Sequence, residues 1–266
     1  MAQAASPSRS VGELTFPDVR RRLRESSILC LPLGAFEQHG THLPLNTDAV
    51  ISEELARRIV ARWGDELDLW LLPTISIGLS REHDWAPGTL CLSIQSFVAL
   101  LKDLGREIAR ALPARNLMIV NGHGGNRGIL ENLLHELHRD CGLNPCVIHP
   151  FDLAPPAIPI GSPDVHGGCA ETSVMLAIAP HLVRLDRMAN ARRTSGEMKE
   201  SIAAMIFDRG VSFPWRSDDP RIAADGVIGE THGASAELGR AIIDGIVAKA
   251  ASVLRCLLEN QNRSLG

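Results

Sequence analysis

Short runs of apolar residues without polar alternation recur along the chain from Ser27 onward. A strand that is buried on both faces gives such a run, whereas a strand with one face in water alternates apolar and polar residues. We therefore predict four buried strands, at residues 27–36, 69–78, 116–121 and 146–151.

Between these runs the apolar residues recur at helical spacing. Ile51, Leu55 and Ile59 stand at i, i+4 and i+8, which is the pattern of an amphipathic helix. The same period predicts helices at residues 48–63, 93–112, 126–140 and 234–259. Asn126 and Ser235 stand near two of these starts, where their side chains can cap the helix.

Strands that alternate with helices predict an α/β fold, a three-layer αβα sandwich around a mostly parallel sheet. We expect one domain that spans residues 1–266, with residues 1–10 disordered. Two irregular segments, at residues 150–163 and 211–229, could be lids or subunit contacts. Ligands of such sheets bind beyond the carboxyl ends of the strands, so functional residues should follow the predicted strands.

Composition narrows the class of protein. Hydrophobic residues make up 45% of the chain and charged residues 22%, which is an ordinary globular balance. A net charge of −4 without a basic patch argues against nucleic-acid binding, and no apolar stretch reaches the roughly 18 residues of a membrane span. The six cysteines are scattered and no secretion signal is visible, so we expect a cytoplasmic protein with reduced thiols.

The richest chemistry directly follows the first predicted strand. Glu37 and His39 are two residues apart, so in extended backbone their side chains project to the same side and can share one ion. Asp48 stands at the head of the next helix, where its two oxygens can bridge two cations. Carboxylates mixed with imidazoles suit zinc, manganese or iron. These three residues are therefore candidate metal ligands.

Two more histidines stand in glycine-rich turns. His123 follows the third predicted strand and is flanked by glycines, which allow a ligand to approach the backbone closely at Gly124 and Asn126. His166 also precedes glycines, and Glu171 enters the first turn of a helix after it. We predict His123 and Glu171 as metal ligands, His166 as a proton carrier, and Gly124 and Asn126 as substrate contacts.

Other interpretations of these residues stay open. Glu171 could instead interact favourably with the dipole of its helix, and His166 could be a turn residue. His42 is less well placed than His39, and we favour a structural or supporting role for it. The segment 80–89 follows the second predicted strand, so His83 and Thr89 are candidate substrate contacts, although a polar loop with a Pro-Gly turn is an equal alternative.

Taken together, the chain resembles the creatininase family of metal-dependent amidohydrolases over residues 27 to about 253. The first motif is long and specific, and the others follow it in the same order. The resemblance is carried by Glu37, His39, His42 and Asp48 in the first motif, by Glu82-His83 with Pro87-Gly88-Thr89, and by segments 121–126, 166–173 and 224–229.

The resemblance implies a centre of two divalent metal ions, Zn, Mn or Fe, with Asp48 as the bridge, and hydrolysis of a C–N amide bond, as in creatinine or a related small amide. It also implies a homo-oligomer, such as a hexamer. In creatininase a carboxylate ligand follows the second-motif histidine by two positions, a place that Gly125 holds here, and a glutamate stands where this chain has Val165.

Other functions fit the same motifs. Relatives with the motif of residues 121–126 include a formamide deformylase and a peptidase that trims a precursor peptide, both of cofactor biosynthesis. A substrate is therefore expected to be a small molecule or a short peptide. A more remote alternative is a catalytically silent metal-binding scaffold that kept the fold.

Overall fold

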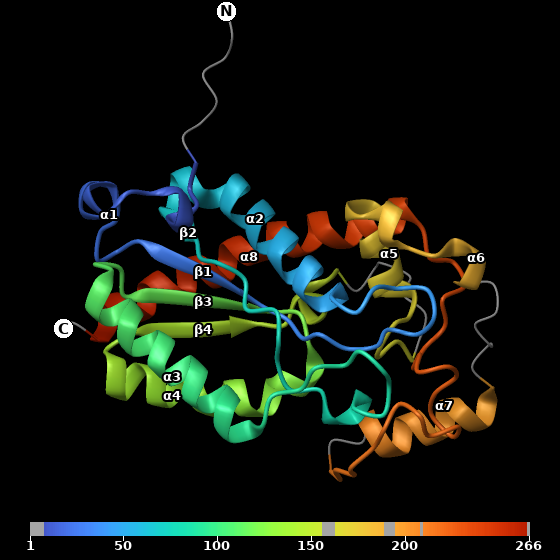
Figure 1. The fold of residues 1–266 in the computed structure, drawn as a ribbon. Helices are drawn as coiled ribbons and strands as arrows, with labels where there is room; N and C mark the ends of the chain where they lie inside the picture. Colours follow the sequence, from blue (N-terminus) through green and yellow to red (C-terminus); the bar gives the residue numbers. More distant parts are fainter. Residues whose placement is uncertain (1–7, 156–162, 189–194, 208–209, 265–266) are drawn as a thin grey trace, which may run out of the picture.

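The computed structural model describes residues 8–155, 163–188, 195–207 and 210–264. At its centre is a sheet whose three strand pairings are all parallel, in the order β2-β1-β3-β4. The strands point toward one end of the molecule, where the loops that follow them gather (Figure 1). The strands are β1 (Ile28–Leu33), β2 (Leu69–Leu71), β3 (Asn116–Asn121) and β4 (Asn144–Ile148).

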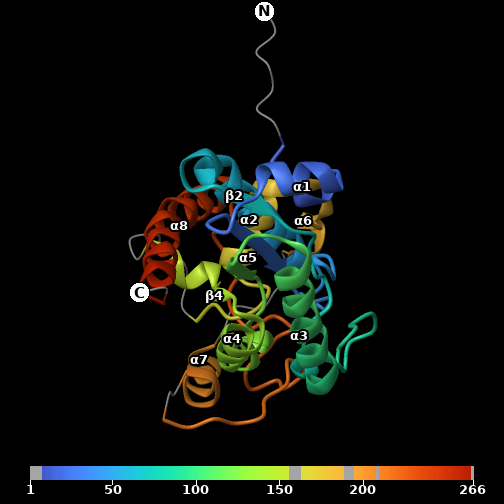
Figure 2. The same cartoon turned by 90° about the vertical axis from the view of Figure 1, so that its left-hand side faces the viewer.

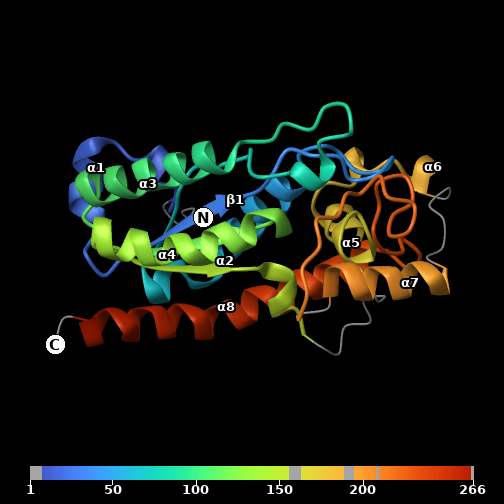
Figure 3. The ribbon, with the colours of Figure 1, turned by 90° about the horizontal axis from the view of Figure 1, so that it is seen from below.

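Helices cover both faces of the sheet. Figures 2 and 3 show α8 on one side of the strands and α3 on the other. The helices are α1 (Phe16–Arg22), α2 (Thr47–Leu67), α3 (Ile94–Ala111), α4 (Arg127–Cys141), α5 (Cys169–Ile178), α6 (Leu185–Met188), α7 (Gly196–Ile202) and α8 (Ala236–Ser264). Short helical turns are η1 (Val11–Glu13), η2 (Arg81–His83), η3 (Gly124–Asn126), η4 (Pro150–Leu153), η5 (Pro180–Leu182) and the π-helical η6 (Ala203–Phe207).

Two hydrophobic cores lie on the two faces of the sheet because successive strand residues point to opposite sides. Ile28 and Cys30 of β1 pack in the core formed with α2, α5 and α8. Leu29 and Leu31 pack in the other core, with α3 and α4. All six residues of β1 are buried, as are all six of β3. The prediction of a three-layer α/β fold is therefore confirmed, and so is burial on both faces for β1 and β3, whereas the first four residues of β4 are only partly buried.

Several predicted boundaries differ from the structure. The strand expected at residues 69–78 is shorter, because β2 ends at Leu71 and the chain then touches β1 through a single bridge between Ile75 and Leu33. The irregular segment predicted at residues 150–163 begins with η4, and its residues 156–162 lie outside the described residues. Within the stretch expected to be disordered, residues 1–7 also lie outside them, whereas Arg9 pairs with Asp65 and Asp68.

The free cysteines differ in exposure. Cys30 and Cys169 are buried, whereas Cys256 is exposed on α8. Among the described helices, none combines the length and the apolar character that crossing a membrane requires.

Candidate metal centre

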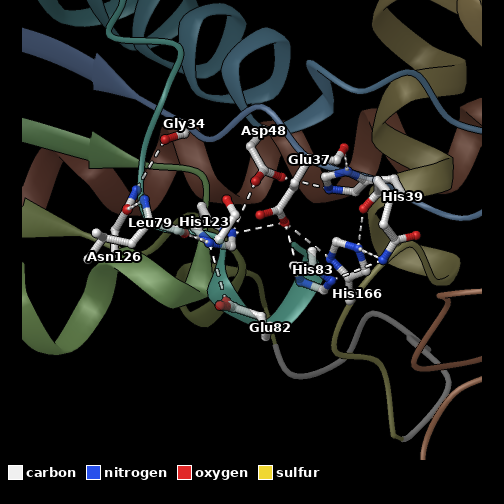
Figure 4. Close-up of polar contacts among 12 residues, drawn as sticks. Gly34, Glu37, His39, Asp48, Leu79, Glu82, His83, His123, Asn126 and His166 are labelled. Carbon is white, nitrogen blue, oxygen red and sulfur yellow. Dashed lines mark hydrogen bonds and ion pairs between the residues drawn. The ribbon is translucent and has the colours of Figure 1, made fainter. Parts of the chain in front are cut away.

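Acidic and imidazole side chains from separate parts of the chain meet at the carboxyl end of the sheet (Figure 4). Glu37 and His39 follow β1, and His123 follows β3. Asp48 lies in the first turn of α2 and Glu171 in the first turn of α5. These are the five residues that the sequence suggests as metal ligands, and the structure brings all of them to one place.

Two glycines let Asp48 come this close to the sheet. A Cβ atom on Gly34 would lie 2.7 Å from the carbonyl carbon of Asp48, and one on Gly122 would lie 2.5 Å from its carbonyl oxygen. Side chains at either position would push the start of α2 away from the ends of β1 and β3. The close approach of a backbone is a common reason for glycine at such a position.

One group of ligand atoms surrounds the Nδ1 atom of His123. This atom lies 3.1 Å from Oε1 of Glu37 and 3.2 Å from Oδ2 of Asp48. The ligand atoms of the three residues all lie within 4.8 Å of one another. A single cation could therefore contact an atom of each side chain.

A second group lies on the other side of Asp48. Nε2 of His39 is 2.9 Å from Oδ1 of Asp48 and 3.8 Å from Oε2 of Glu171. Glu171 also accepts a hydrogen bond from the main-chain N–H of Gly167 at 2.6 Å, which holds its carboxylate in place. Asp48 therefore takes part in both groups, one oxygen in each, as a bridging carboxylate would.

Main-chain carbonyls orient the two imidazoles. Nδ1 of His39 is 3.1 Å from the carbonyl oxygen of Glu37, and Nε2 of His123 contacts that of Leu79. A nitrogen that donates to a carbonyl carries a proton, so whenever these rings are neutral, Nε2 of His39 and Nδ1 of His123 have their lone pairs toward the carboxylates. This arrangement is typical of histidines that bind metals.

The chemistry of the cluster fits a pair of cations. Both carboxylate oxygens of Glu37 and Oδ2 of Asp48 are buried, and they accept no hydrogen bond from any described residue. Buried carboxylate oxygens without partners are costly, since burial removes the water that would otherwise solvate them. Divalent cations held between these oxygens and the free imidazole nitrogens would satisfy them, and this donor set suits zinc, manganese or iron.

Without metal ions, bound protons supply the positive charge in the cluster. Burial alone would lower the pKa of His39, but the adjacent Asp48 carboxylate outweighs it and raises this pKa to about 10. Burial raises the pKa of Glu171 to about 8, although His39 opposes the shift. Burial would likewise lower the pKa of His123, and Glu37 raises it well above its ordinary value.

These shifts predict that metal binding depends on pH. Near pH 7 the metal-free His39 and Glu171 both hold protons, since the pKa values are about 10 and about 8, and a cation must displace them. The affinity for zinc should therefore rise with pH through about 8 and fall with acidification. Calorimetric titration in buffers of different ionisation enthalpy should detect proton release on binding. Binding without proton release, at constant affinity from pH 6 to 8, would contradict this charge state.

His166 and His83 stand beside the ligand groups. Nδ1 of His166 lies 3.5 Å from Oε1 of Glu37, and its Nε2 lies 2.6 Å from the carbonyl oxygen of Gln38. The His166 ring stacks on that of His83, with centroids 3.9 Å apart. His166 also forms a three-residue group with Glu37 and His39 that could hold an ion. The arrangement therefore permits both the proton-carrying role and a role as ligand.

A cavity of about 500 Å³ opens onto the cluster. His123, His166 and Glu171 form part of its wall, so the metal centre can be reached from outside. Its other lining residues are Arg81, Glu82, His83, Gly124, Gly125, Val165, Phe213, Pro214, Trp215 and Arg216. The segment 211–229, which the sequence suggests as a lid or a subunit contact, contributes the aromatic part of this wall.

The four predicted substrate contacts fall into two pairs. His83 and Gly124 line the cavity. Asn126 is fully buried instead: its Oδ1 accepts from the N–H of Leu79 at 2.9 Å, and its Nδ2 donates to the carbonyl of Gly34 at 3.1 Å. The hydroxyl of Thr89 accepts from the N–H of Gln38 at 3.2 Å. This geometry favours a structural role for Asn126 and Thr89 over the substrate contact suggested by the sequence.

Asn126 also differs from its expected role as a helix cap. Its side chain makes no cap hydrogen bond at the start of α4, because the amide joins the segments that follow three strands. Ser235, by contrast, accepts from the N–H of Leu238 at 3.1 Å, as its position before α8 predicts. His42 lies apart from the ligand groups and contacts the hydroxyl of Thr172 at 2.8 Å.

Gln38 and Ser217 also lie at the site, although the sequence does not identify them as functional residues. The Gln38 amide nitrogen lies 3.0 Å from Nδ1 of His83, 3.0 Å from the hydroxyl of Ser217 and 3.0 Å from the carbonyl oxygen of Gly226. Gln38 therefore links the metal-ligand loop to the cavity wall. Its place between Glu37 and His39 is a signal that could have identified it, whereas nothing in the irregular segment around Ser217 distinguishes that serine.

Comparisons with known proteins show which family the chain resembles. A family model described as creatinine amidohydrolase matches residues 12–254. The chain is 36% identical to a mycofactocin precursor peptide peptidase of Mycobacterium tuberculosis over 215 residues, 76% of this chain and 80% of that protein. It is 30% identical to a creatinine amidohydrolase of Pseudomonas putida over 274 residues, 94% of this chain and 97% of the relative.

A solved structure described as creatininase with Mn has the same fold. The superposition has a TM-score of 0.74 at 29% sequence identity, and it covers 93% of this chain and 98% of that one. The similarity therefore extends over most of both chains.

Proposed function

This chain belongs to the creatininase family of hydrolases that act on C–N bonds, and from that premise we propose that it hydrolyses an amide bond with a pair of divalent metal ions. Glu37, Asp48 and His123 would hold one ion, and His39, Asp48 and Glu171 the other. When bound, such ions lower the pKa of a water molecule and polarise the scissile carbonyl. Zinc, manganese and iron are the candidate metals.

The shared position of Asp48 is the observation that carries this proposal. Its two oxygens lie in two different groups of ligand atoms, 2.9 Å from His39 and 3.2 Å from His123. A carboxylate that only formed an ion pair would need one imidazole partner. Two imidazoles on opposite oxygens, together with the two Glu37 oxygens that accept no hydrogen bond from a described residue, support a two-metal centre.

We propose His166 as the group that carries the proton to the departing nitrogen. Burial and the neighbouring His39 lower the pKa of His166 well below its ordinary value, so the ring is neutral. With its Nε2 proton on the carbonyl of Gln38, the lone pair of Nδ1 faces the centre. Nδ1 can take a proton from the attacking water and pass it to the nitrogen as the C–N bond breaks.

Replacing His166 tests this role. His166→Ala should lower kcat by about 10²-fold or more, because general acid-base catalysis typically contributes 10²–10⁴-fold. The metal content measured by elemental analysis should stay at the wild-type value. Loss of one ion from the variant would instead identify His166 as a ligand, in line with its position beside Glu37 and His39.

We favour a peptide bond as the target over a cyclic amide such as creatinine. A cavity of about 500 Å³ has room for more than one small ring and lies within the usual range of 300–1,000 Å³ for ligand sites. A relative that is 36% identical is a precursor peptide peptidase. Creatinine remains the second candidate, since the match to a creatinine amidohydrolase spans 94% of the chain, and a formamide is the third.

A side-by-side assay separates these substrates. Short peptides, creatinine and a formamide-bearing pyrimidine would each be incubated with the zinc-loaded and the manganese-loaded chain, with a chelator-treated sample as control. We expect metal-dependent cleavage of peptides at the highest kcat/KM. Metal binding without hydrolysis of any substrate in a broad amide panel would favour the silent scaffold. The homo-oligomer that the resemblance implies stays a prediction, which sedimentation of the purified chain would test.

A further inference from the structure

Glu82 places a carboxylate beside the metal centre that belongs to neither group of ligand atoms. Its Oε1 lies 3.4 Å from Nε2 of His123, on the opposite side of the ring from the Nδ1 that faces Glu37 and Asp48 (Figure 4). The Glu82 side chain lines the cavity and is 16% exposed. It therefore contacts a ligand histidine from outside the space between the ligands.

The backbone of Glu82 is fixed by Ser217, which follows the cavity-lining Arg216 in the chain. Its carbonyl oxygen accepts a hydrogen bond from the N–H of Ser217 at 2.9 Å and one from the Ser217 hydroxyl at 3.3 Å. Ser217 is itself fully buried. The backbone that carries the Glu82 side chain is therefore held by the packed structure.

Gly125 supplies the space that the Glu82 carboxylate occupies. A Cβ atom on Gly125 would overlap both Oε1 of Glu82 and Nε2 of His123, and it would lie 2.9 Å from the carbonyl oxygen of Leu79. No side chain fits here while Glu82 and His123 hold these positions. Gly124, in contrast, has no atom within 4 Å of where its Cβ would stand.

The same nitrogen of His123 therefore faces two acceptors, the Leu79 carbonyl and the Glu82 carboxylate. A carboxylate on the N–H side of a metal-binding imidazole orients the ring and makes its other nitrogen a stronger ligand. The carbonyl of Leu79 orients the ring but carries no net charge. The contribution that only Glu82 can make is therefore electrostatic.

We propose that Glu82 is a positioning residue of the metal centre, which reaches His123 through the gap at Gly125 and strengthens the binding of the ion held by Glu37, Asp48 and His123. The proposal rests on the two-metal function proposed above. The carboxylate comes from η2, and the missing side chain at Gly125 leaves the space for it.

Glu82→Gln tests the charge while keeping the shape of the side chain. In zinc titrations of the metal-free chain, one of the two dissociation constants should rise 10- to 100-fold, which is the usual cost of losing such a partner. The other constant should stay within about twofold, since Glu82 does not contact His39 or Glu171. The melting temperature of the metal-free variant should match that of the wild type, which a merely structural role would not predict.

Gly125→Ala tests whether the space beside Gly125 is needed for Glu82 to reach His123. The added methyl group should displace His123 and Glu82 and so lower the affinity for the same zinc ion. Gly124→Ala should leave both dissociation constants unchanged. The double variant Glu82→Gln/Gly125→Ala should lose less affinity than the product of the two single losses, because both changes disturb one contact.

Two results would overturn the role of Glu82. Unchanged zinc affinity in Glu82→Gln would show that the charge of Glu82 does not strengthen metal binding. An equal loss of affinity at both ions would show that its effect is not specific to the ion held by His123. A wild-type chain that binds no zinc would instead contradict the proposed two-metal function itself. The failures of the two proposals can therefore be told apart in the same titration.

Discussion

Asp48→Asn should empty the metal centre and abolish most hydrolysis. One oxygen of Asp48 faces His39 and the other faces His123. An uncharged amide at this position would therefore weaken the binding of both proposed ions. We expect fewer than two metal ions per chain and a fall in kcat/KM of about 10³-fold, which corresponds to losing about 4 kcal/mol of transition-state stabilisation. Elemental analysis and steady-state kinetics measure the two effects.

Glu237→Gln is the matched control for this change. Glu237 also lies in the first turn of a helix, α8, but it is exposed and far in sequence from the ligands. If the carboxylate of Asp48 acted only on the helix dipole, both variants would lose a few tenths of a kcal/mol to about 1 kcal/mol of stability and nothing else. Full metal content and normal turnover in Asp48→Asn would refute the bridging role.

Gly122→Ala should damage both the fold and the centre. The new Cβ atom would lie 2.5 Å from the carbonyl oxygen of Asp48 and 3.2 Å from the Cβ of Ser52, so α2 must move away from the end of β3. Overpacking of this kind costs about 1–3 kcal/mol of unfolding free energy. Because Asp48 moves with α2, zinc affinity should fall as well. Urea denaturation and zinc titration give the two quantities.

Gly128→Ala provides the comparison six residues later. Gly128 is exposed in the first turns of α4, and a Cβ atom there would meet no atom within 4 Å. Alanine is the better helix former, so this variant should be as stable as the wild type or slightly more stable. If Gly122→Ala behaved in the same way, the close approach of α2 to the sheet would not be what positions Asp48.

The fold could be predicted where a single local pattern determines the structure. The run at residues 116–121 gives β3 with the same bounds, because a strand covered on both faces is apolar throughout its interior, here between Asn116 and Asn121. The ligand loops could be located for a related reason. Parallel strands all end at one edge, so residues that follow β1 and β3 must lie near one another.

The remaining features depend on contacts between distant segments, which no local pattern encodes. Asn126 has the sequence position of a helix cap. Its side-chain amide instead forms hydrogen bonds with the carbonyl of Gly34 and the N–H of Leu79. The role of Gly125 appears only when Glu82, 43 positions earlier, is seen to fill its space. Ser217 joins Gln38 and Glu82 across the cavity, and only the folded chain shows this.

The most direct test of the two-metal centre is a crystal structure of the chain as purified, with anomalous scattering recorded at the Mn, Fe and Zn edges. We predict two anomalous peaks on either side of the Asp48 carboxylate, one next to Glu37 and His123 and the other next to His39 and Glu171. A fully active chain without an anomalous peak between these side chains, whose hydrolysis a chelator does not reduce, would contradict the account.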